Sequence, residues 1–169
     1  MAFFSKDKKG KIETNAVGGS TQSQLFKTIR ETLDEMDWGY DVDESKYVIR
    51  TGMKGDDLSI PLLIIVENNT LVFLSPLNLE AKEENYKTVT WELNNINKGI
   101  KFGKFFLDGD NGRIFYQFSF PYIEAAVSKK FFATFLQIVL ETVDEHDGDL
   151  KKIAEKSTST ASAADYLYQ

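Results

Sequence analysis

The residues best suited to chemistry lie in two acidic stretches, and the first begins at Asp108. Asp108, Asp110 and Asn111 resemble the start of a calcium-binding EF-hand loop. Such a loop needs an oxygen ligand at its fifth position, Gly at its sixth and Glu at its twelfth. Counted from Asp108, those positions hold Gly112, Arg113 and Ser119. Because Asp, Asn and Gly are also the residues that favour tight turns, we predict a hairpin turn here.

The second acidic stretch lies within residues 141–149 and includes the chain's one histidine, His146. Its carboxylates are Glu141, Asp144, Glu145, Asp147 and Asp149. Glu141 and Glu145 have the i, i+4 spacing that places two carboxylates on one helix face, where they could hold a hard cation. Negative charge near a helix C-terminus opposes the helix dipole, which favours a solvated acidic face. Both interpretations stay open, and His146 is not expected to be catalytic.

Composition excludes several classes of function. The 169-residue chain has no Cys, which rules out disulfides, thiol nucleophiles and thiolate metal sites. It has no Gly-x-Ser-x-Gly sequence and no Gly-rich phosphate-binding loop. Its net charge of −6 gives no general attraction to nucleic acid or to anionic membranes, despite the aromatic-rich stretch 102–135. We therefore predict no catalytic residues, no cofactor, no metal site and no enzymatic activity.

The chain divides into three parts. Residues 1–19 form a Lys-rich arm, residues 20–156 a single domain, and residues 157–169 a low-complexity tail. The tail ends in the aromatic sequence Asp165-Tyr166-Leu167-Tyr168-Gln169, which either packs on the domain or serves as a docking motif. The longest apolar run, residues 62–66, is far below the roughly 18 residues of a spanning helix. With no export signal visible, we expect a cytoplasmic protein.

Hydrophobic periodicity predicts the secondary structure of the domain. Thr21 and Gln24 form a capping box at the start of a helix that ends at Trp38-Gly39. Pro76 is expected to stop the strand that precedes it, and Asn68-Asn69-Thr70 is a plausible hairpin turn. The expected strands cover residues 47–50, 60–67, 71–75, 103–107 and 113–120, and two further helices cover residues 83 or 84 to 95 and 128–145.

This order of elements predicts the α+β class. It has one helix, three or four strands, a second helix, two strands and a final helix, so we expect a single antiparallel sheet flanked by three main helices. The residues expected in the core share apolar character and a position on the buried face of an element. They are Leu25, Ile29, Leu33, Ile64, Phe73, Leu93, Tyr116, Phe118, Phe135 and Val139.

Three local sequences resemble a known family. They are Leu62 to Pro76 (LLIIVENNTLVFLSP), Leu93 to Asn97 (LNNIN) and Gly103 to Tyr116 (GKFFLDGDNGRIFY), followed by a strand that ends in Pro and an apolar helix. Over residues 20–153 the chain resembles the YbjN-like bacterial domains, which are similar in fold to type III secretion chaperones. The resemblance implies a compact α+β domain, commonly dimeric, without established enzymatic activity. YbjN-like domains are often labelled sensory-transduction regulators, and the chaperones bind extended segments of client proteins.

The apolar surface predicts a partner. The strands at 60–67 and 71–75 lack polar alternation, and the last helix is apolar around most of its circumference. We expect a homodimer, with strand edges left to bind an extended client segment. The side chains expected at the partner interface are Ile64, Val66, Trp91, Phe131, Phe135 and Ile138. The function predicted is a non-catalytic protein-binding or chaperone-like module with a regulatory role. A small enzyme with a carboxylate-based site is the alternative, which a deep carboxylate-lined pocket would favour.

Overall fold

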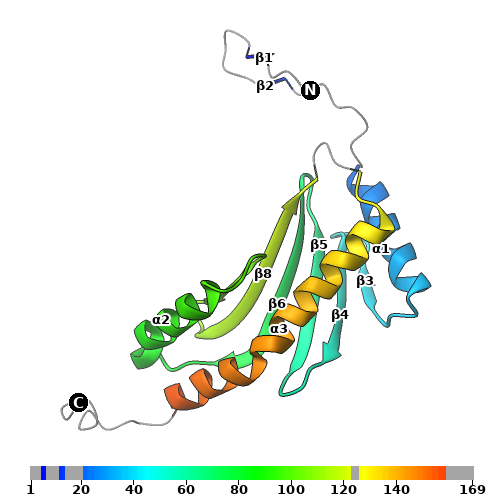
Figure 1. The fold of residues 1–169 in the computed structure, drawn as a ribbon. Coiled ribbons are helices and arrows are strands. Elements are labelled where there is room, and N and C mark those ends of the chain that lie inside the picture. Colours follow the sequence, from blue (N-terminus) through cyan, green and yellow to red (C-terminus); the bar gives the residue numbers. More distant parts are fainter. Residues whose placement is uncertain (1–4, 7–11, 14–20, 123–125, 159–169) are drawn as a thin grey trace, which may run out of the picture.

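The structure, a computed structural model, describes residues 5–6, 12–13, 21–122 and 126–158 (Figure 1). The helices are α1 (Gln22–Glu35), the 3₁₀ turn η1 (Glu83–Asn85), α2 (Tyr86–Asn97) and α3 (Lys129–Thr158). The strands are β1 (Ser5–Lys6), β2 (Ile12–Glu13), β3 (Asp41–Asp43), β4 (Val48–Lys54), β5 (Ser59–Val66), β6 (Thr70–Glu80), β7 (Lys104–Leu107) and β8 (Arg113–Pro121).

The main sheet has six antiparallel strands in the order β3-β4-β5-β6-β8-β7. A separate two-stranded pair joins β1 to β2. The long helix α3 crosses the sheet diagonally, as Figure 1 shows, and α1 packs beside the first half of α3. The α+β class with one antiparallel sheet and three main helices is therefore confirmed.

Helix α1 begins as the capping box predicts. The Thr21 hydroxyl accepts from the Gln24 amide at 3.3 Å, and the Gln24 side chain accepts from the Thr21 amide at 3.0 Å. The Gln22 side-chain amide then donates to the carbonyl of Val66, at the end of β5, at 2.6 Å. This bond fixes the start of α1 to one end of the sheet.

Strand β6 continues past Pro76 to Glu80, so the expectation that Pro76 ends the strand is wrong. The ladder between β5 and β6 stops at the pair Leu63–Leu74, two residues before the proline. Pro76 has no amide hydrogen, but it removes no hydrogen bond to β5, because the two strands no longer pair there. On its other side β6 continues to pair with β8. Where β5 and β6 separate, the hydroxyl of the buried Ser75 donates to the Pro61 carbonyl at 2.6 Å.

Helix α3 runs to Thr158, well beyond the predicted end at Glu145. Two residues of the second acidic stretch, which was expected to be a solvated face or a cation site, accept hydrogen bonds from the turn between β4 and β5. Asp147 accepts from the amides of Asp57 and Leu58 at 2.9 and 3.0 Å, and Asp144 accepts from the Asp56 amide at 2.9 Å. Gly148 lets the turn approach, since a Cβ there would lie 2.8 Å from Asp57 Oδ2.

The core lies between α1, α3 and one face of the sheet. All of the predicted core residues are buried except Phe135, which is half-buried. At its centre the Phe73 ring stacks on the rings of Phe118 and Phe132, with centroids 6.0 and 5.9 Å apart. Aromatic contacts of this kind add to the free energy of burying apolar area.

Candidate protein-binding surface

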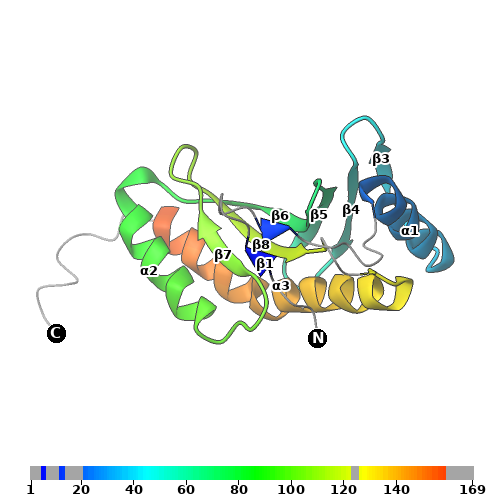
Figure 2. The ribbon, with the colours of Figure 1, turned by 90° about the horizontal axis from the view of Figure 1, so that it is seen from above.

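The two faces of the sheet differ in what covers them. The strand register places Ile49, Ile64 and Phe73 in one row across neighbouring strands, and all three are fully buried. Helices α1 and α3 lie against this face, and α2 lies on the same side (Figure 2). In the same view no helix lies over the opposite face of β5 and β6. The lack of polar alternation in these strands is typical of strands covered on both faces, but the described helices cover only one face.

The uncovered side of the sheet is called the open face here, and its central side chains are apolar. They alternate along each strand with the core residues; Val72 is buried, and the others are half-buried. They are Val48, Pro61, Leu63, Ile65, Val72, Leu74, Pro76, Phe106 and Phe115. These side chains come from the five neighbouring strands β4, β5, β6, β8 and β7, and apolar patches of such extent are unusual on the surface of a monomer.

The borders of the open face are charged. The edge strand β3 contributes Asp41 and Asp43 at one side, and the edge strand β7 contributes Lys104 at the other. Asp43 lies 3.9 Å from the guanidinium of Arg50 on β4. An apolar centre with a charged rim is the usual organisation of a protein interface.

The predicted interface residues lie in three different places. Ile64 and Val66 are 0% and 1% exposed beneath the chain's own helices, so their assignment to an interface is wrong. Trp91 on α2 is 63% exposed, with the Lys98 ammonium 5.7 Å from its ring centroid. Phe131, Phe135 and Ile138 on α3 are half-buried. The structure does not bring these six side chains together on one surface.

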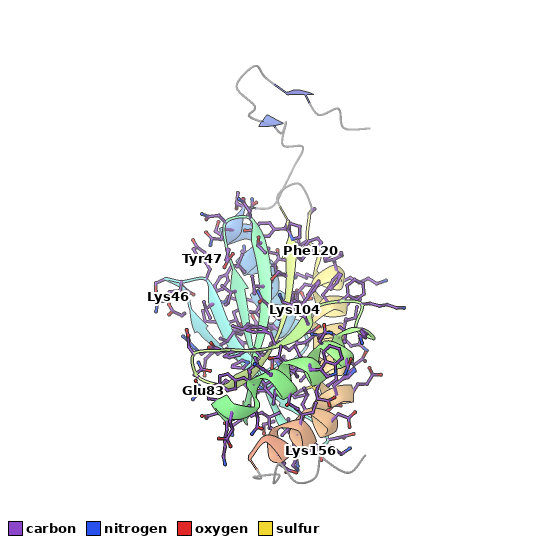
Figure 3. All side chains as sticks on the ribbon, turned by 90° about the vertical axis from the view of Figure 1, so that its left-hand side faces the viewer. Lys46, Tyr47, Glu83, Lys104, Phe120 and Lys156 are labelled. Atoms are coloured by element: carbon purple, nitrogen blue, oxygen red, sulfur yellow. The ribbon has the colours of Figure 1, made fainter. Side chains whose placement is uncertain are left out.

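Helix α3 is apolar around most of its circumference, and other residues of the same chain cover much of this apolar surface. The Phe131 ring contacts Phe120 at 5.1 Å, and the Phe135 ring stacks on Phe118 at 5.1 Å. Phe102, which is 42% exposed, packs edge-on against Phe135 at 5.7 Å. We call these five rings the aromatic strip. It follows the outer edge of β8, on the side of the molecule that Figure 3 shows with Phe120 labelled.

The strand edges beside the strip differ in protection. On β7, the side-chain amide of Asn97 accepts from the Phe105 amide at 2.8 Å and donates to the Phe105 carbonyl at 2.9 Å. Just after β8, the Tyr122 amide donates to the carbonyl of Asn69, which precedes β6, at 3.1 Å. Because main-chain groups alternate sides along a strand, those of Ser119 and Pro121 point away from β6. Both residues are exposed, and β7 pairs only with residues 114–117.

The two acidic stretches have structural roles. Asp108 accepts from the Asp110 amide at 3.0 Å and from the Asn111 side chain at 2.6 Å, which confirms the predicted hairpin turn. Asp144 and Asp147 hold the β4–β5 turn, as described above. His146 places its Nδ1 2.9 Å from the Thr142 carbonyl. Among the described residues, no group of three or more His, Asp or Glu side chains could hold a metal ion.

A hollow between α1 and the β3–β4 turn is lined by carboxylates, the feature that would favour the enzyme alternative. Its carboxylates are paired. Glu44 lies 2.5 Å from the Arg30 guanidinium, and Asp34 accepts from the Tyr40 hydroxyl at 2.7 Å. A hydrogen bond from Lys129 lowers the pKa of Glu31. A general acid needs a raised carboxyl pKa, and the pKa of Glu31 moves in the opposite direction.

Sequence reasoning missed the open face. Leu63 and Ile65 alternate with Leu62 and Ile64 in a run that is apolar throughout, so periodicity could not tell which set faces the helices. The one signal was the lack of polar alternation itself. It indicated a partner but not the strand face that the partner would cover.

Fold and surface together define a class: small α+β domains whose antiparallel sheet carries helices on one face. The chain belongs to the YbjN family, whose model, described as "Putative bacterial sensory transduction regulator", matches residues 26–152. The chain is also similar to a solved structure, "Crystal structure of YbjN, a putative transcription regulator from E. coli". Sequence identity is 18% and the TM-score is 0.57, over 73% of this chain and 91% of the other.

At that identity the solved structure supports the shared fold alone. Among curated proteins, none matches the sequence. None of the helices in the described ranges has the length and apolar character needed to cross a membrane.

Proposed function

We propose that this domain is a non-catalytic protein-binding module with a regulatory or chaperone-like role, and that a second copy of the chain covers its open face. The observation that carries the proposal is the open face itself. Half-buried apolar side chains from five neighbouring strands lie on a surface that no described helix covers. Burying such area on association is favourable at about 25 cal/mol per Å².

Charge supports a second copy as the occupant. A twofold axis parallel to the strands would place β3 of one copy over β7 of its partner. Asp41 of one copy would then face the partner's Lys104, and the reverse pair would form at the other border. Opposite charges at the rim set the orientation of two surfaces more than they add affinity. Stacked sheets with apolar inner faces are a common packing arrangement.

Single cysteines can test this arrangement, because the chain has none of its own. Leu63→Cys, Leu74→Cys and Phe115→Cys each place one thiol on the open face. Trp91→Cys and Lys152→Cys place one on the exposed side of α2 or α3. With a short bismaleimide, we expect covalent dimers from at least one open-face variant and none from the two controls. Dimers only from the controls, or from no variant, would contradict the proposal.

A further inference from the structure

The open face differs in shape between its two sides. On the β8 side the rings of Phe115 and Phe106 stack with their centroids 5.4 Å apart, and they are the bulkiest apolar side chains of the face. On the β4 side lies Gly52, which has no side chain. A Cβ at Gly52 would lie 2.5 Å from the carbonyl oxygen of Ile60, so the close approach of β5 requires glycine there. The face therefore has a projection on one side and a gap on the other.

The projection and the gap lie at the same height on the strands. Gly52 pairs with Pro61 across β4 and β5, and Pro76 pairs with Phe115 across β6 and β8. Pro61 and Pro76 each lie two residues past the last pair of β5 with β6, so the four residues form one row. The sheet order β3-β4-β5-β6-β8-β7 has its midline between β5 and β6. Gly52 and Phe115 are therefore equally far from this midline, on opposite sides of it.

Cationic side chains flank the gap. Because side chains alternate along a strand, Arg50 and Lys54 lie on the open face on either side of Gly52, and both are exposed. The aliphatic stems of Arg and Lys pack against apolar groups, and their charged ends are attracted to the face of an aromatic ring. A hollow of about 380 Å³, lined in part by Gly39 and Gly52, continues the gap toward β3. The gap therefore suits an aromatic ring.

We infer that the Phe115 ring of each copy fills the Gly52 gap of the other copy in the dimer on the open face. This inference rests on the proposed function, because it needs the second copy. A twofold axis that follows the midline, parallel to the strands, keeps each row at its own height and places β8 of one copy over β4 of the other. Phe115 of one copy then lies over Gly52 of the other, and symmetry repeats the contact.

The packing angle between two sheets is compatible with this contact. Aligned sheets cross at about 30°, and Phe115 lies about 7 Å from the midline, which is one and a half strand spacings. The crossing therefore moves the ring by about 4 Å along the strand that it faces. Arg50 and Lys54 are four residues apart, about 13 Å along β4. The ring therefore stays between the two cationic side chains.

A twofold axis perpendicular to the strands fits the face worse. It would place β4 over β4 and β3 over β3, so the gap would face a strand that has no aromatic residue. Asp41 and Asp43 of one copy would face β3 of the other, which carries the same carboxylates. Like charges across an interface are unfavourable. Shape and charge therefore select the axis that is parallel to the strands.

Cross-linking between two different single-cysteine chains tests this arrangement. Val48 on β4 and Ser119 on β8 lie in another row of the open face, and Val48→Cys and Ser119→Cys are small changes. In the inferred dimer Val48 of one copy faces Ser119 of the other, whereas two copies of the same residue are about 14 Å apart, three strand spacings. With a short bismaleimide, a mixture of the two chains should give the mixed covalent dimer. Each chain alone should give little product.

Removal of the ring tests the contact with Gly52. Phe115→Ala should raise the dimer dissociation constant at least about tenfold in sedimentation equilibrium, because it empties the gap. The control is Gln117→Ala, which truncates a neighbouring side chain on the same face of β8 and should change the constant less than about threefold. Thermal unfolding checks that both variants are folded.

The outcomes separate this inference from the proposed function. Covalent dimers of Leu63→Cys and of Val48→Cys alone, without the mixed product, would overturn the inferred axis and leave the open-face dimer in place. Equal dissociation constants for Phe115→Ala and Gln117→Ala would overturn the contact with Gly52 and again leave the dimer. The absence of any dimer would overturn both proposals.

Discussion

The two faces of the sheet are built from the same strands and nearly the same residue types, yet they have different surroundings. On β5, Leu62 and Ile64 are fully buried beneath the helices, whereas their neighbours Leu63 and Ile65 are half-buried on the open face. The helical layer, rather than the hydrophobicity of the strand, decides which set forms the core. The covered face should therefore determine stability, and the open face should determine association.

The largest expected effect is on the covered face, at Phe73. Its ring is fully buried between Phe118 and Phe132, so Phe73→Ala removes apolar area and leaves a cavity. The free energy of unfolding should fall by about 3–5 kcal/mol in a urea titration. The matched control is Leu74→Ala on the open face, measured at a protein concentration where the chain is monomeric. A loss for Leu74→Ala as large as for Phe73→Ala would break the comparison between the faces.

The next effect concerns alkaline pH and Tyr116, which lies fully buried on the covered face. Burial raises the pKa of Tyr116 from its ordinary value of 10.0 to about 12. Because the unfolded chain ionises first, stability is complete below pH 10 and is lost as the pH rises to about 12. The difference of about two pKa units corresponds to about 2–3 kcal/mol.

Unfolding titrations between pH 9 and 12 would measure this loss. Tyr116→Phe cannot ionise and should show a shallower decline, although it also loses the 2.6 Å hydrogen bond to the Phe102 carbonyl. An identical pH slope in both proteins would show that Tyr116 does not titrate as proposed.

A smaller effect is expected where α3 holds the β4–β5 turn. Asp147 is 2% exposed and accepts hydrogen bonds from two turn amides, so Asp147→Ala leaves two part-buried amides without this partner. The expected loss in unfolding free energy is about 1–3 kcal/mol. The exposed Asp149, two residues later, is the control, and Asp149→Ala should change stability by less than about 0.5 kcal/mol. Equal effects would show that the Asp147 contacts carry little of the stability.

The sequence predicted most of the local structure, because local signals determine it. The capping box at Thr21, the turn after Asp108 and the alternation from Ile114 to Phe118 all act within a few residues. The features it missed depend on distant contacts. Asp147 accepts a hydrogen bond from the amide of Asp57, which lies 90 residues away in the sequence. Nothing near Asp147 in the sequence indicates that role.

The dependence on distant contacts also explains why Ile64 and Val66 were wrongly assigned to the partner interface. Ile64 and Leu63 are both apolar β-strand residues. The sequence therefore indicated that the strands have more apolar surface than one face needs, but not which of the two residues faces the helices. Phe131 and Phe135 made α3 look too apolar for one contact, and the rings that meet them come from β8 and Phe102. Only the packing of distant elements shows that much of this stripe is used within the chain.

The most direct test of the account is sedimentation equilibrium of the wild-type chain and of Leu63→Asp at micromolar concentration. We predict a wild-type dimer and a Leu63→Asp monomer, because a carboxylate at the centre of the open face would be buried without a partner. The dimer dissociation constant should rise by at least about 100-fold, a change of about 2.7 kcal/mol. Thermal unfolding of the variant checks that it is folded. A wild-type monomer that binds no apolar dye, or a dimer that is unchanged by Leu63→Asp, would contradict the central claim.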